Sequence, residues 1–183
     1  MPFWKKDVPL SLIKNLKAIA MDVDGVLTDG GIIWDSAGRE SKIFNAQDGL
    51  GISLAKTAGL HIIWITGRES SVVEKRAKEL GVDLLIQGAR GKSKALRQAC
   101  ETLALSPEEI AYIADDLNDF PAFSLVGLKI AVGNAAKEIK ESADLLLEKE
   151  GGKGAVREAI EEILRKRGKY EEIIKLFLEK LEE

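Results

Sequence analysis

The stretch that most constrains this chain is KAIAMDVDGVLTDG, residues 17–30. Its apolar segment AIAM, residues 18–21, has no helical spacing and is typical of a buried parallel strand. Asp22 and Asp24 follow at once, and Gly25 then allows a sharp turn. Open α/β sheets bind ligands beyond the carboxyl ends of their strands, and two acids this close together favour a bound cation or a raised pKa. Taken alone, an Asp-rich turn that merely ends a strand explains the stretch equally well.

The composition excludes several classes of protein. The chain has 183 residues, of which 45% are hydrophobic, so it is long enough for one domain with a proper core. Its formal net charge of -3 gives no basic footprint, so no nucleic-acid partner is expected. A single cysteine, Cys100, excludes an intrachain disulfide and a cysteine-based zinc site. No apolar run resembles a signal peptide or a membrane span, so we expect a soluble, cytoplasmic protein that does not bind membranes.

Apolar strands alternate with amphipathic helices along the rest of the chain. This alternation predicts an α/β fold, a doubly wound parallel sheet with helices on both faces. A β-hairpin is expected at about residues 31–45, with Trp34 packing against Phe44 across it. The remaining expected strands are 60–66, 82–86, 110–114, 128–132 and an edge strand at 144–147, and the expected helices are 48–58, 69–80 and 92–103.

One domain with a C-terminal tail is expected. Residues 1–167 form the α/β domain, in which residues 1–16 are a lead-in to the first strand of the core. Residues 168–183 form a C-terminal amphipathic helix or tail, because apolar side chains recur there at helical spacing. Such an appended helix is more often a docking or oligomer element than a catalytic one.

Three further motifs follow the first in the order that such a sheet requires. Thr66 ends an apolar strand in ITGR, Lys92 opens a helix in GKSKAL, and ADDLND, residues 114–119, follows another strand. We expect the acids of the first and last motifs to converge on one pocket, where each close pair costs ~4 kcal/mol at an effective dielectric of about 20. Oxygen ligands without a His or Cys cluster suit a hard cation such as Mg²⁺.

Together these motifs resemble those of the haloacid dehalogenase superfamily of phosphatases. DVDGVLTDG, FNAQDGLGI and GGKGAVRE resemble the branch that dephosphorylates 3-deoxy-D-manno-octulosonate 8-phosphate (KDO 8-phosphate), and the resemblance covers roughly residues 17–164. It implies a Rossmann-like fold with a hairpin inserted after the first strand. The spacing from Gly30 to Thr66 leaves no room for a cap domain.

The resemblance also implies roles for individual residues. Asp22 is the nucleophile that forms an aspartyl-phosphate, and Asp24 is the general acid and base. Thr66 and Lys92 are the other catalytic residues, because they bind the phosphoryl group and balance its charge. Mg²⁺ is held by Asp22, Asp24 (through its backbone carbonyl) and Asp115. Asp116, Asn118 and Asp119 lie around the ion and act through waters or behind its direct ligands, and the phosphate and substrate contacts are Gly25, Gly67, Arg68 and Lys92.

The implied activity is Mg²⁺-dependent hydrolysis of a small sugar-acid phosphate, KDO 8-phosphate first, in lipopolysaccharide precursor synthesis. Without a cap, neighbouring subunits of a homotetramer are expected to close the site. Gln47 stands where many members of this branch carry Arg, which leaves a nine-carbon sugar-acid phosphate open as the substrate. A non-catalytic assembly module is a further alternative, although all the catalytic residues are present. A phosphate-receiver domain is disfavoured because it lacks the Asp-x-Asp-Gly start.

Other residues are ambiguous. Lys153 and Arg157 are either substrate contacts or surface charges, and the GGKG segment, residues 151–154, is a helix start rather than a phosphate cradle. Asp29 and Asp48 either line the mouth of the site or cap a turn and a helix. The remaining candidates are expected to be structural: His61 within an apolar strand, Cys100 as a small packing residue of a helix, Trp64 in the core, and Trp34 at an interface.

Overall fold

The computed structural model describes residues 1–5 and 7–182. Within these residues the main sheet has seven strands in the order β1-β9-β8-β7-β2-β5-β6. All neighbours pair in parallel except β1, which is antiparallel to β9. The strands are β1 (Phe3–Trp4), β2 (Ala18–Met21), β5 (His61–Ile65), β6 (Leu84–Ile86), β7 (Ile110–Ala114), β8 (Leu128–Ala131) and β9 (Leu145–Leu146).

The first motif follows the strand at the centre of this sheet. Every residue of β2 is buried, as expected for an apolar strand covered on both faces. Met21 at its end lies opposite Trp64 of β5 and Ile113 of β7. The three strands therefore end level with one another, and the residues that follow them meet at one edge of the sheet.

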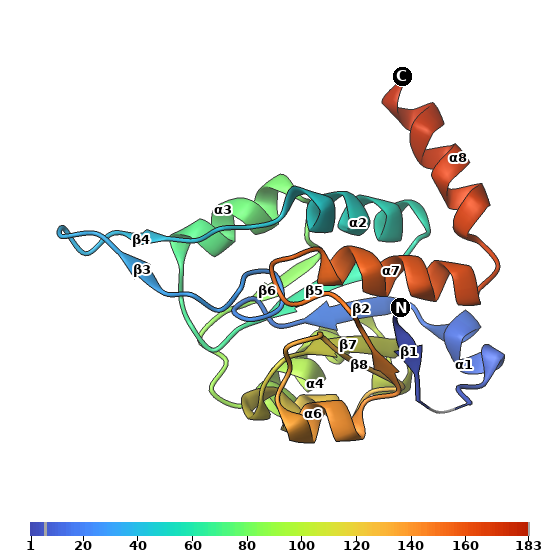
Figure 1. Ribbon diagram of the computed structural model, residues 1–183, viewed down its shortest axis with the longest axis horizontal. Coiled ribbons are helices and arrows are strands. Elements are labelled where there is room, and N and C mark those ends of the chain that lie inside the picture. The colour runs from blue at the N-terminus through green and yellow to red at the C-terminus, as the bar shows by residue number, and fades with distance from the viewer. Residues whose placement is uncertain (6, 183) are drawn as a thin grey trace.

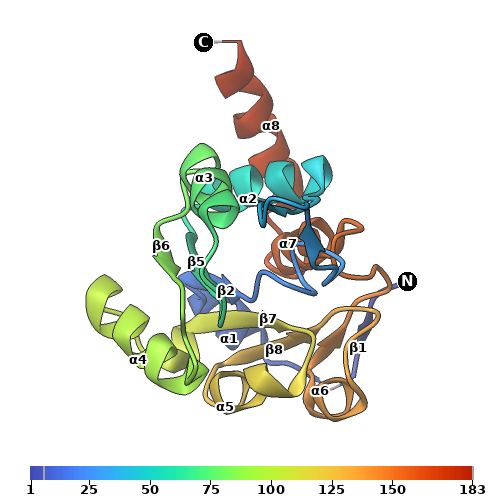
Figure 2. The same ribbon diagram turned by 90° about the vertical axis from the view of Figure 1, so that its left-hand side faces the viewer.

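Helices cover both faces of the sheet, which confirms the doubly wound α/β fold. Figure 2 shows α2, α3 and α7 on one face and α4, α5 and α6 on the other. The helices are α1 (Leu10–Asn15), α2 (Ala46–Thr57), α3 (Ser71–Glu79), α4 (Lys92–Leu103), α5 (Phe120–Phe123), α6 (Lys137–Ser142), α7 (Ala155–Lys166) and α8 (Tyr170–Leu181), with 3₁₀ turns η1 (Pro107–Glu109) and η2 (Leu117–Asp119). In the described chain, only a hairpin and α2 stand between β2 and β5, and only α3 and β6 between β5 and α4, so no cap domain is inserted at either place.

The expected hairpin is present, and it extends from the body of the molecule (Figure 1). It consists of β3 (Ile33–Trp34) and β4 (Glu40–Ser41), paired antiparallel. The expected packing of Trp34 against Phe44 is wrong, because the register places Trp34 opposite Glu40. Phe44 instead stacks on Trp64, with the ring centroids 6.4 Å apart, and so lies over the sheet.

The N-terminal segment is more than a lead-in. Phe3 and Trp4 form β1, which pairs with β9, so β9 is an inner strand and not the expected edge strand.

Helix α2, expected at residues 48–58, begins two residues earlier, at Ala46. Asn45 caps it by accepting a hydrogen bond from the backbone N–H of Gln47 (2.8 Å).

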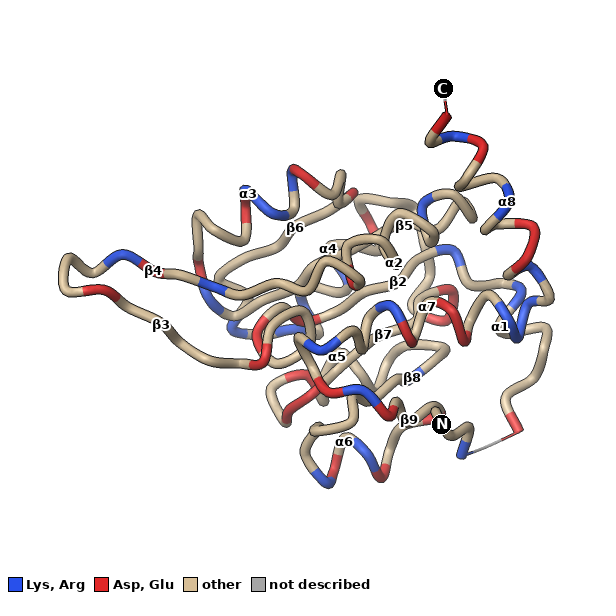
Figure 3. Tube along the Cα trace, turned by 45° about the horizontal axis from the view of Figure 1, so that its top comes forward, with Lys and Arg blue, Asp and Glu red and all other residues tan. Residues whose placement is uncertain are grey.

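Helix α8 projects away from the sheet at the end opposite the hairpin (Figure 1). Its Ile173 is buried, whereas Leu178 and Leu181 are 55% and 63% exposed. Basic and acidic residues are interspersed along α3, α6 and α8 (Figure 3). Among the described residues, no helix combines the length and the apolar character needed to cross a membrane.

Candidate active site

A pocket of about 450 Å³ opens at the carboxyl edge of the sheet, where β2, β5 and β7 end. The loops after these three strands supply its walls. Most of the residues singled out from the sequence contribute to it. Its lining comprises Asp22, Asp24, Gly30, Thr66, Gly67, Arg68, Asp115, Asp116, Leu117 and Asn118.

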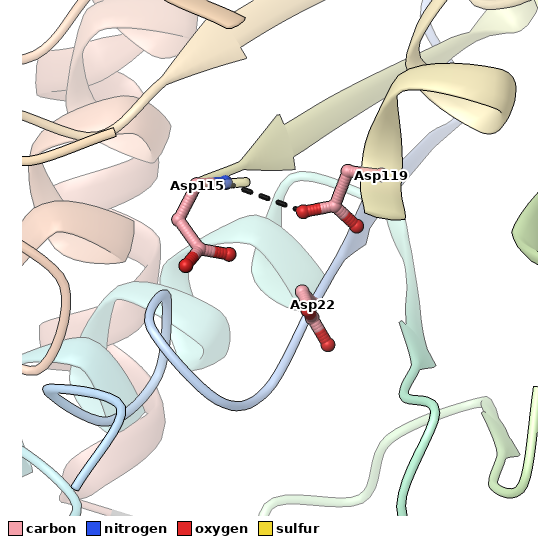
Figure 4. Close-up of side chains that lie close together, drawn as sticks. All are labelled: Asp22, Asp115 and Asp119. Carbon is pink, nitrogen blue, oxygen red and sulfur yellow. Dashed lines mark hydrogen bonds between the residues drawn. The ribbon is translucent and has the colours of Figure 1, made fainter. Parts of the chain in front are cut away.

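Three carboxylates converge at the floor of this pocket and directly beneath it. Asp22 follows β2, Asp115 follows β7 and Asp119 comes from η2, and the three side chains converge (Figure 4). One oxygen from each lies within 4.8 Å of the others. Asp119 accepts a hydrogen bond from the backbone N–H of Asp115 (3.3 Å), whereas the buried Oδ1 of Asp115 has no hydrogen-bond partner within the described residues. Clustered carboxylates with an unused oxygen are the donor set that suits a hard divalent cation.

Lys92 lies beneath the pocket and joins two of these acids. It is the first residue of α4, and only 2% of it is exposed. Its Nζ lies 2.5 Å from Asp22 Oδ2 and 2.6 Å from Asp119 Oδ1. Asp119 is fully buried and also accepts a hydrogen bond from the hydroxyl of Tyr112 (3.0 Å). No sequence motif indicated Tyr112, although it is the one polar side chain in the strand IAYIA.

The acids of the cluster carry more negative charge than Lys92 can offset. Burial, followed by the charge of Asp119, raises the pKa of Asp22 to about 6. Burial, followed by Asp119 and Asp22, raises the pKa of Asp115 to about 8. Burial also lowers the pKa of Lys92, but Asp119 and Asp22 outweigh it, and the net shift is upward. One lysine therefore does not neutralise three acids, and a divalent cation would supply the missing charge.

The second motif contributes the opposite wall. Thr66 directly follows β5 and is 2% exposed, and its Oγ1 accepts a hydrogen bond from the backbone N–H of Arg68 (3.4 Å). Arg68 is half-buried and Gly67 is exposed, and both line the pocket. Asp116 and Asn118 are exposed at the rim, where Asp116 accepts a hydrogen bond from the backbone N–H of Leu117 (2.7 Å).

The hairpin brings two charged residues to the site that the sequence analysis missed. The Lys42 side chain is 1% exposed, and its Nζ pairs with Asp24 and lies 3.4 Å from Glu40 Oε1. Glu40 also accepts a hydrogen bond from Arg68 Nη2 (2.8 Å), while Arg68 Nε lies 3.8 Å from Asp24 Oδ2. A ring of alternating charges therefore holds Asp24. In the sequence, these residues appear only as Glu-Ser-Lys after the hairpin turn. That pattern does not indicate which part of the fold the hairpin contacts.

Gly25 makes the close approach of the first and last motifs possible. Its φ of +93° lies in the left-handed region, and a Cβ added there would lie 2.5 Å from the carboxyl carbon of Asp115. Thr28 fixes the loop, because its Oγ1 accepts hydrogen bonds from the backbone N–H groups of Gly25 (3.4 Å) and Gly30 (3.2 Å).

Several other candidates lie outside the pocket. Asp29 caps a turn by accepting a hydrogen bond from the N–H of Gly31 (2.9 Å). Asp48 neither lines the mouth nor caps α2: it is buried and accepts a hydrogen bond from the N–H of Arg157 (2.9 Å). Gln47 and Arg157 line a different pocket, formed mainly by α7. Lys153 is exposed, and the half-exposed His61 lies 3.5 Å from Asp83, whereas Trp64 and Cys100 are buried as expected.

Comparison with known proteins places these features in one family. The family of haloacid dehalogenase-like hydrolases matches residues 86–160. The 3-deoxy-D-manno-octulosonate 8-phosphate phosphatase of Escherichia coli K12 is 42% identical over 159 residues, which cover 87% of this chain and 85% of that protein. The enzyme of the same name from Yersinia pestis is 40% identical over 157 residues, with coverage of 86% and 84%.

Solved structures agree with the sequence comparison. The phosphatase of the same name from Moraxella catarrhalis, in complex with magnesium, phosphate and KDO, has a TM-score of 0.88 and 42% identity, and the match covers 92% of this chain and 97% of that one. A hydrolase of subfamily III A from Legionella pneumophila also has a TM-score of 0.88, with 40% identity and 93% coverage of both chains. This chain therefore belongs to the haloacid dehalogenase-like hydrolases, in the capless branch of the 3-deoxy-D-manno-octulosonate 8-phosphate phosphatases.

Proposed function

We propose that this protein is a Mg²⁺-dependent phosphatase that hydrolyses KDO 8-phosphate through an aspartyl-phosphate on Asp22. The observation that supports this best is the arrangement of Asp22 and Asp115 on the pocket floor, with the buried Lys92 against Asp22 (2.5 Å). The relatives from E. coli and Y. pestis, whose names state this activity, share 40–42% of the residues over most of the chain.

In the first half of the reaction, a carboxylate oxygen of Asp22 attacks phosphorus, and the bond from phosphorus to the sugar oxygen breaks. Asp24 gives its proton to the departing oxygen, so that the sugar acid leaves as an alcohol. Lys92 holds Asp22 by a charge-assisted contact, which keeps the nucleophile ionised and aimed into the pocket. Thr66 and the backbone around Gly67 donate hydrogen bonds to the phosphoryl oxygens.

In the second half, water attacks the phosphorus of the aspartyl-phosphate. Asp24, now ionised, accepts a proton from this water, and the bond from phosphorus to Asp22 breaks. Inorganic phosphate leaves, and both acids return to their starting states. The charged ring of Lys42, Glu40 and Arg68 keeps Asp24 in one position through both proton transfers.

Asp22, Asp115 and the backbone carbonyl of Asp24 would hold the Mg²⁺ ion. The pocket fits such an ion because the carboxylate oxygens converge and Asp115 Oδ1 has no other partner among the described residues. When bound, Mg²⁺ supplies positive charge that offsets the acids and the phosphoryl group. Asp119 belongs to the layer beneath, since Lys92, Tyr112 and the Asp115 amide already use its oxygens.

Arg68 is the residue that we assign to the substrate anion at the pocket wall. Within one chain, Gln47 lies in a different pocket and reaches the substrate only if a neighbouring subunit brings it there. Because Gln47 replaces an Arg found in many relatives, a nine-carbon sugar-acid phosphate is the second candidate substrate.

A homotetramer in the cytoplasm completes the proposal. Four apolar side chains on the hairpin, Ile32, Ile33, Trp34 and Ile43, are 45–69% exposed. Apolar patches of this kind mark protein interfaces. Hairpins from neighbouring subunits would cover one another and shelter an open site that has no cap.

The proposal is tested by phosphate release from KDO 8-phosphate, the nine-carbon analogue and hexose phosphates, each with Mg²⁺ and with EDTA. We expect metal-dependent preference for the eight-carbon acid and loss of activity in Asp22→Asn. Asp7→Asn, an exposed acid before α1, serves as the matched control. Full activity of Asp22→Asn would contradict the mechanism, and preference for the nine-carbon acid would change only the substrate.

A further inference from the structure

The GGKG segment, residues 151–154, has no role in the chemistry above, although it lies close to it. It belongs to the loop between β9 and α7, and none of its residues lines the active-site pocket. It is therefore not a phosphate cradle within this chain. Among its contacts are the backbone of the first motif and Asn134.

Gly151 packs directly on the backbone of the first motif. A Cβ added to Gly151 would lie 2.5 Å from the carbonyl carbon of Gly25, closer still to its oxygen, and 3.0 Å from the carbonyl oxygen of Thr28. These are backbone atoms and cannot rotate away. The next residue ties the same two loops together, because the N–H of Gly152 donates to the carbonyl of Val26 (3.0 Å).

Gly25 is thus held between two groups. On one side its Cα faces the carboxylate of Asp115, and on the other its carbonyl faces Gly151. Both contacts are too close to admit a methyl group. A displacement of Gly25 therefore moves the adjoining Asp24 and changes its distance from Asp115.

The loop between β8 and α6 anchors this arrangement. Asn134 Oδ1 accepts a hydrogen bond from the N–H of Gly151 (3.0 Å), and the N–H of Gly133 donates to the carbonyl of Lys149 (2.8 Å). The same loop holds the last motif, since the N–H of Ala136 donates to the carbonyl of Asp115 (2.7 Å). One loop therefore connects Asp115 and Gly151, the two groups that enclose Gly25.

We propose that Gly151 and Asn134 are positioning residues that set the spacing between the Asp24–Gly25 backbone and Asp115. The inference rests on the proposed function, because that spacing is the one between the general acid and the metal-binding carboxylate. Gly151 acts by its lack of a side chain, and Asn134 acts by holding the Gly151 amide.

The test compares Gly151→Ala, Asn134→Ala and Asn134→Asp with the wild-type protein. Two quantities are measured: steady-state phosphate release with Mg²⁺, and the dissociation constant for Mn²⁺, read from the signal of free Mn²⁺ in electron paramagnetic resonance. A displacement of about 1 Å at a reacting centre costs ~100-fold in rate. We therefore expect kcat to fall about 100-fold in Gly151→Ala, with KM for the substrate changed far less and Mn²⁺ binding weakened.

Asn134 is exposed, so its substitution leaves the core intact. Asn134→Ala, like Gly151→Ala, should lower kcat and Mn²⁺ affinity. Asn134→Asp keeps the acceptor oxygen, so its kcat and Mn²⁺ affinity should stay close to those of the wild-type protein. Gly168→Ala is the matched control for glycine replacement: its φ is +68°, and nothing lies within 4 Å of an added Cβ. It should lose stability without any change in kcat or Mn²⁺ binding.

Unchanged kcat and Mn²⁺ affinity in both Gly151→Ala and Asn134→Ala would overturn the inference. So would losses that follow only the folded fraction, measured by near-ultraviolet circular dichroism. A wild-type protein that binds Mn²⁺ but releases no phosphate would count against the proposed function alone. In that case the Mn²⁺ measurements on the variants would still decide the placement of the loop.

Discussion

Asp115 has the least favourable surroundings of the acids in the pocket. Its pKa is raised to about 8, so between pH 4 and pH 8 the folded protein retains a proton there that the unfolded chain has lost. In this range stability falls as the pH rises, because the native state binds more protons than the unfolded state. The raised pKa of Asp22, about 6, adds to this effect over the lower part of the range.

We therefore expect the melting temperature of the protein in EDTA to fall between pH 5 and pH 8. Mg²⁺ should reverse the fall, because the cation favours ionised carboxylates. Asp115→Asn should flatten the profile, and calorimetry at four or five pH values measures all three effects. A wild-type profile in EDTA that rises with pH, or one that Asp115→Asn leaves unchanged, would contradict the raised pKa.

Tyr112 belongs to the layer beneath the acids of the pocket. Its hydroxyl donates to Asp119, which in turn holds Lys92 against Asp22. A hydrogen bond to a charged group contributes ~1.5–3 kcal/mol, so Tyr112→Phe should lower the free energy of unfolding by about that amount in urea titrations. It should also lower kcat with little change in KM. Tyr170→Phe, on α8 and away from the pocket, is the control. Equal losses of kcat in both variants would contradict the role of Tyr112 in holding Lys92 through Asp119.

The sequence predicted the residues of the pocket better than those that support it. Asp22, Thr66, Lys92 and Asp115 stand in contiguous motifs at the ends of strands and the start of a helix, and a parallel sheet brings such ends to one edge. The structure places all of them at or directly beneath one pocket. Tyr112 and Lys42 belong to no sequence motif, because their role in the pocket depends on contacts with other segments of the chain.

At the scale of elements, the same distinction holds. The positions of β2, β7 and α4 were predicted residue for residue, since each has a continuous apolar run or a clear helical start. Strand β1 was missed because two residues, Phe3 and Trp4, give no pattern, and only their pairing with β9 makes them a strand. The hairpin was predicted, but the direction in which it folds depends on the tertiary ion pairs of Lys42 and Glu40.

Those ion pairs join the hairpin to Asp24 and Arg68 in the wall of the pocket. Removal of one partner from a buried ion pair costs ~3–5 kcal/mol, because it leaves a buried charge without compensation. Lys42→Met should therefore destabilise the protein by about this amount, measured in urea, and lower kcat because Asp24 loses its contact. Adding Glu40→Gln to the first substitution should recover much of the stability and little of the kcat. Recovery of both would show that Lys42 acts only through the fold.

At the scale of the whole molecule, the hairpin and the open pocket are connected. The pocket has no cap to exclude water, while the hairpin that reaches it exposes apolar side chains on β3 and in the segments next to β3 and β4. A tetramer built on the hairpins would bury these side chains and enclose the site in one step, whereas a monomer would leave both exposed. The projecting α8 carries a second exposed apolar surface at the other end of the molecule. Substitutions can therefore test the hairpin and α8 as interfaces one at a time.

Replacement of Trp34 tests the hairpin surface without changing α8. Trp34 is 56% exposed, and the centroid of its ring lies 6.0 Å from the guanidinium carbon of Arg68. Sedimentation velocity at micromolar concentration should show a tetramer for the wild-type protein and smaller species for Trp34→Glu. Loss of the tetramer should raise KM and lower kcat together, because the site is then open to water on every subunit. Leu181→Glu, at the far end on α8, should leave the hairpin contacts and the activity intact. A wild-type monomer with full activity would show instead that one chain encloses its substrate alone, and the exposed hairpin would then need another partner.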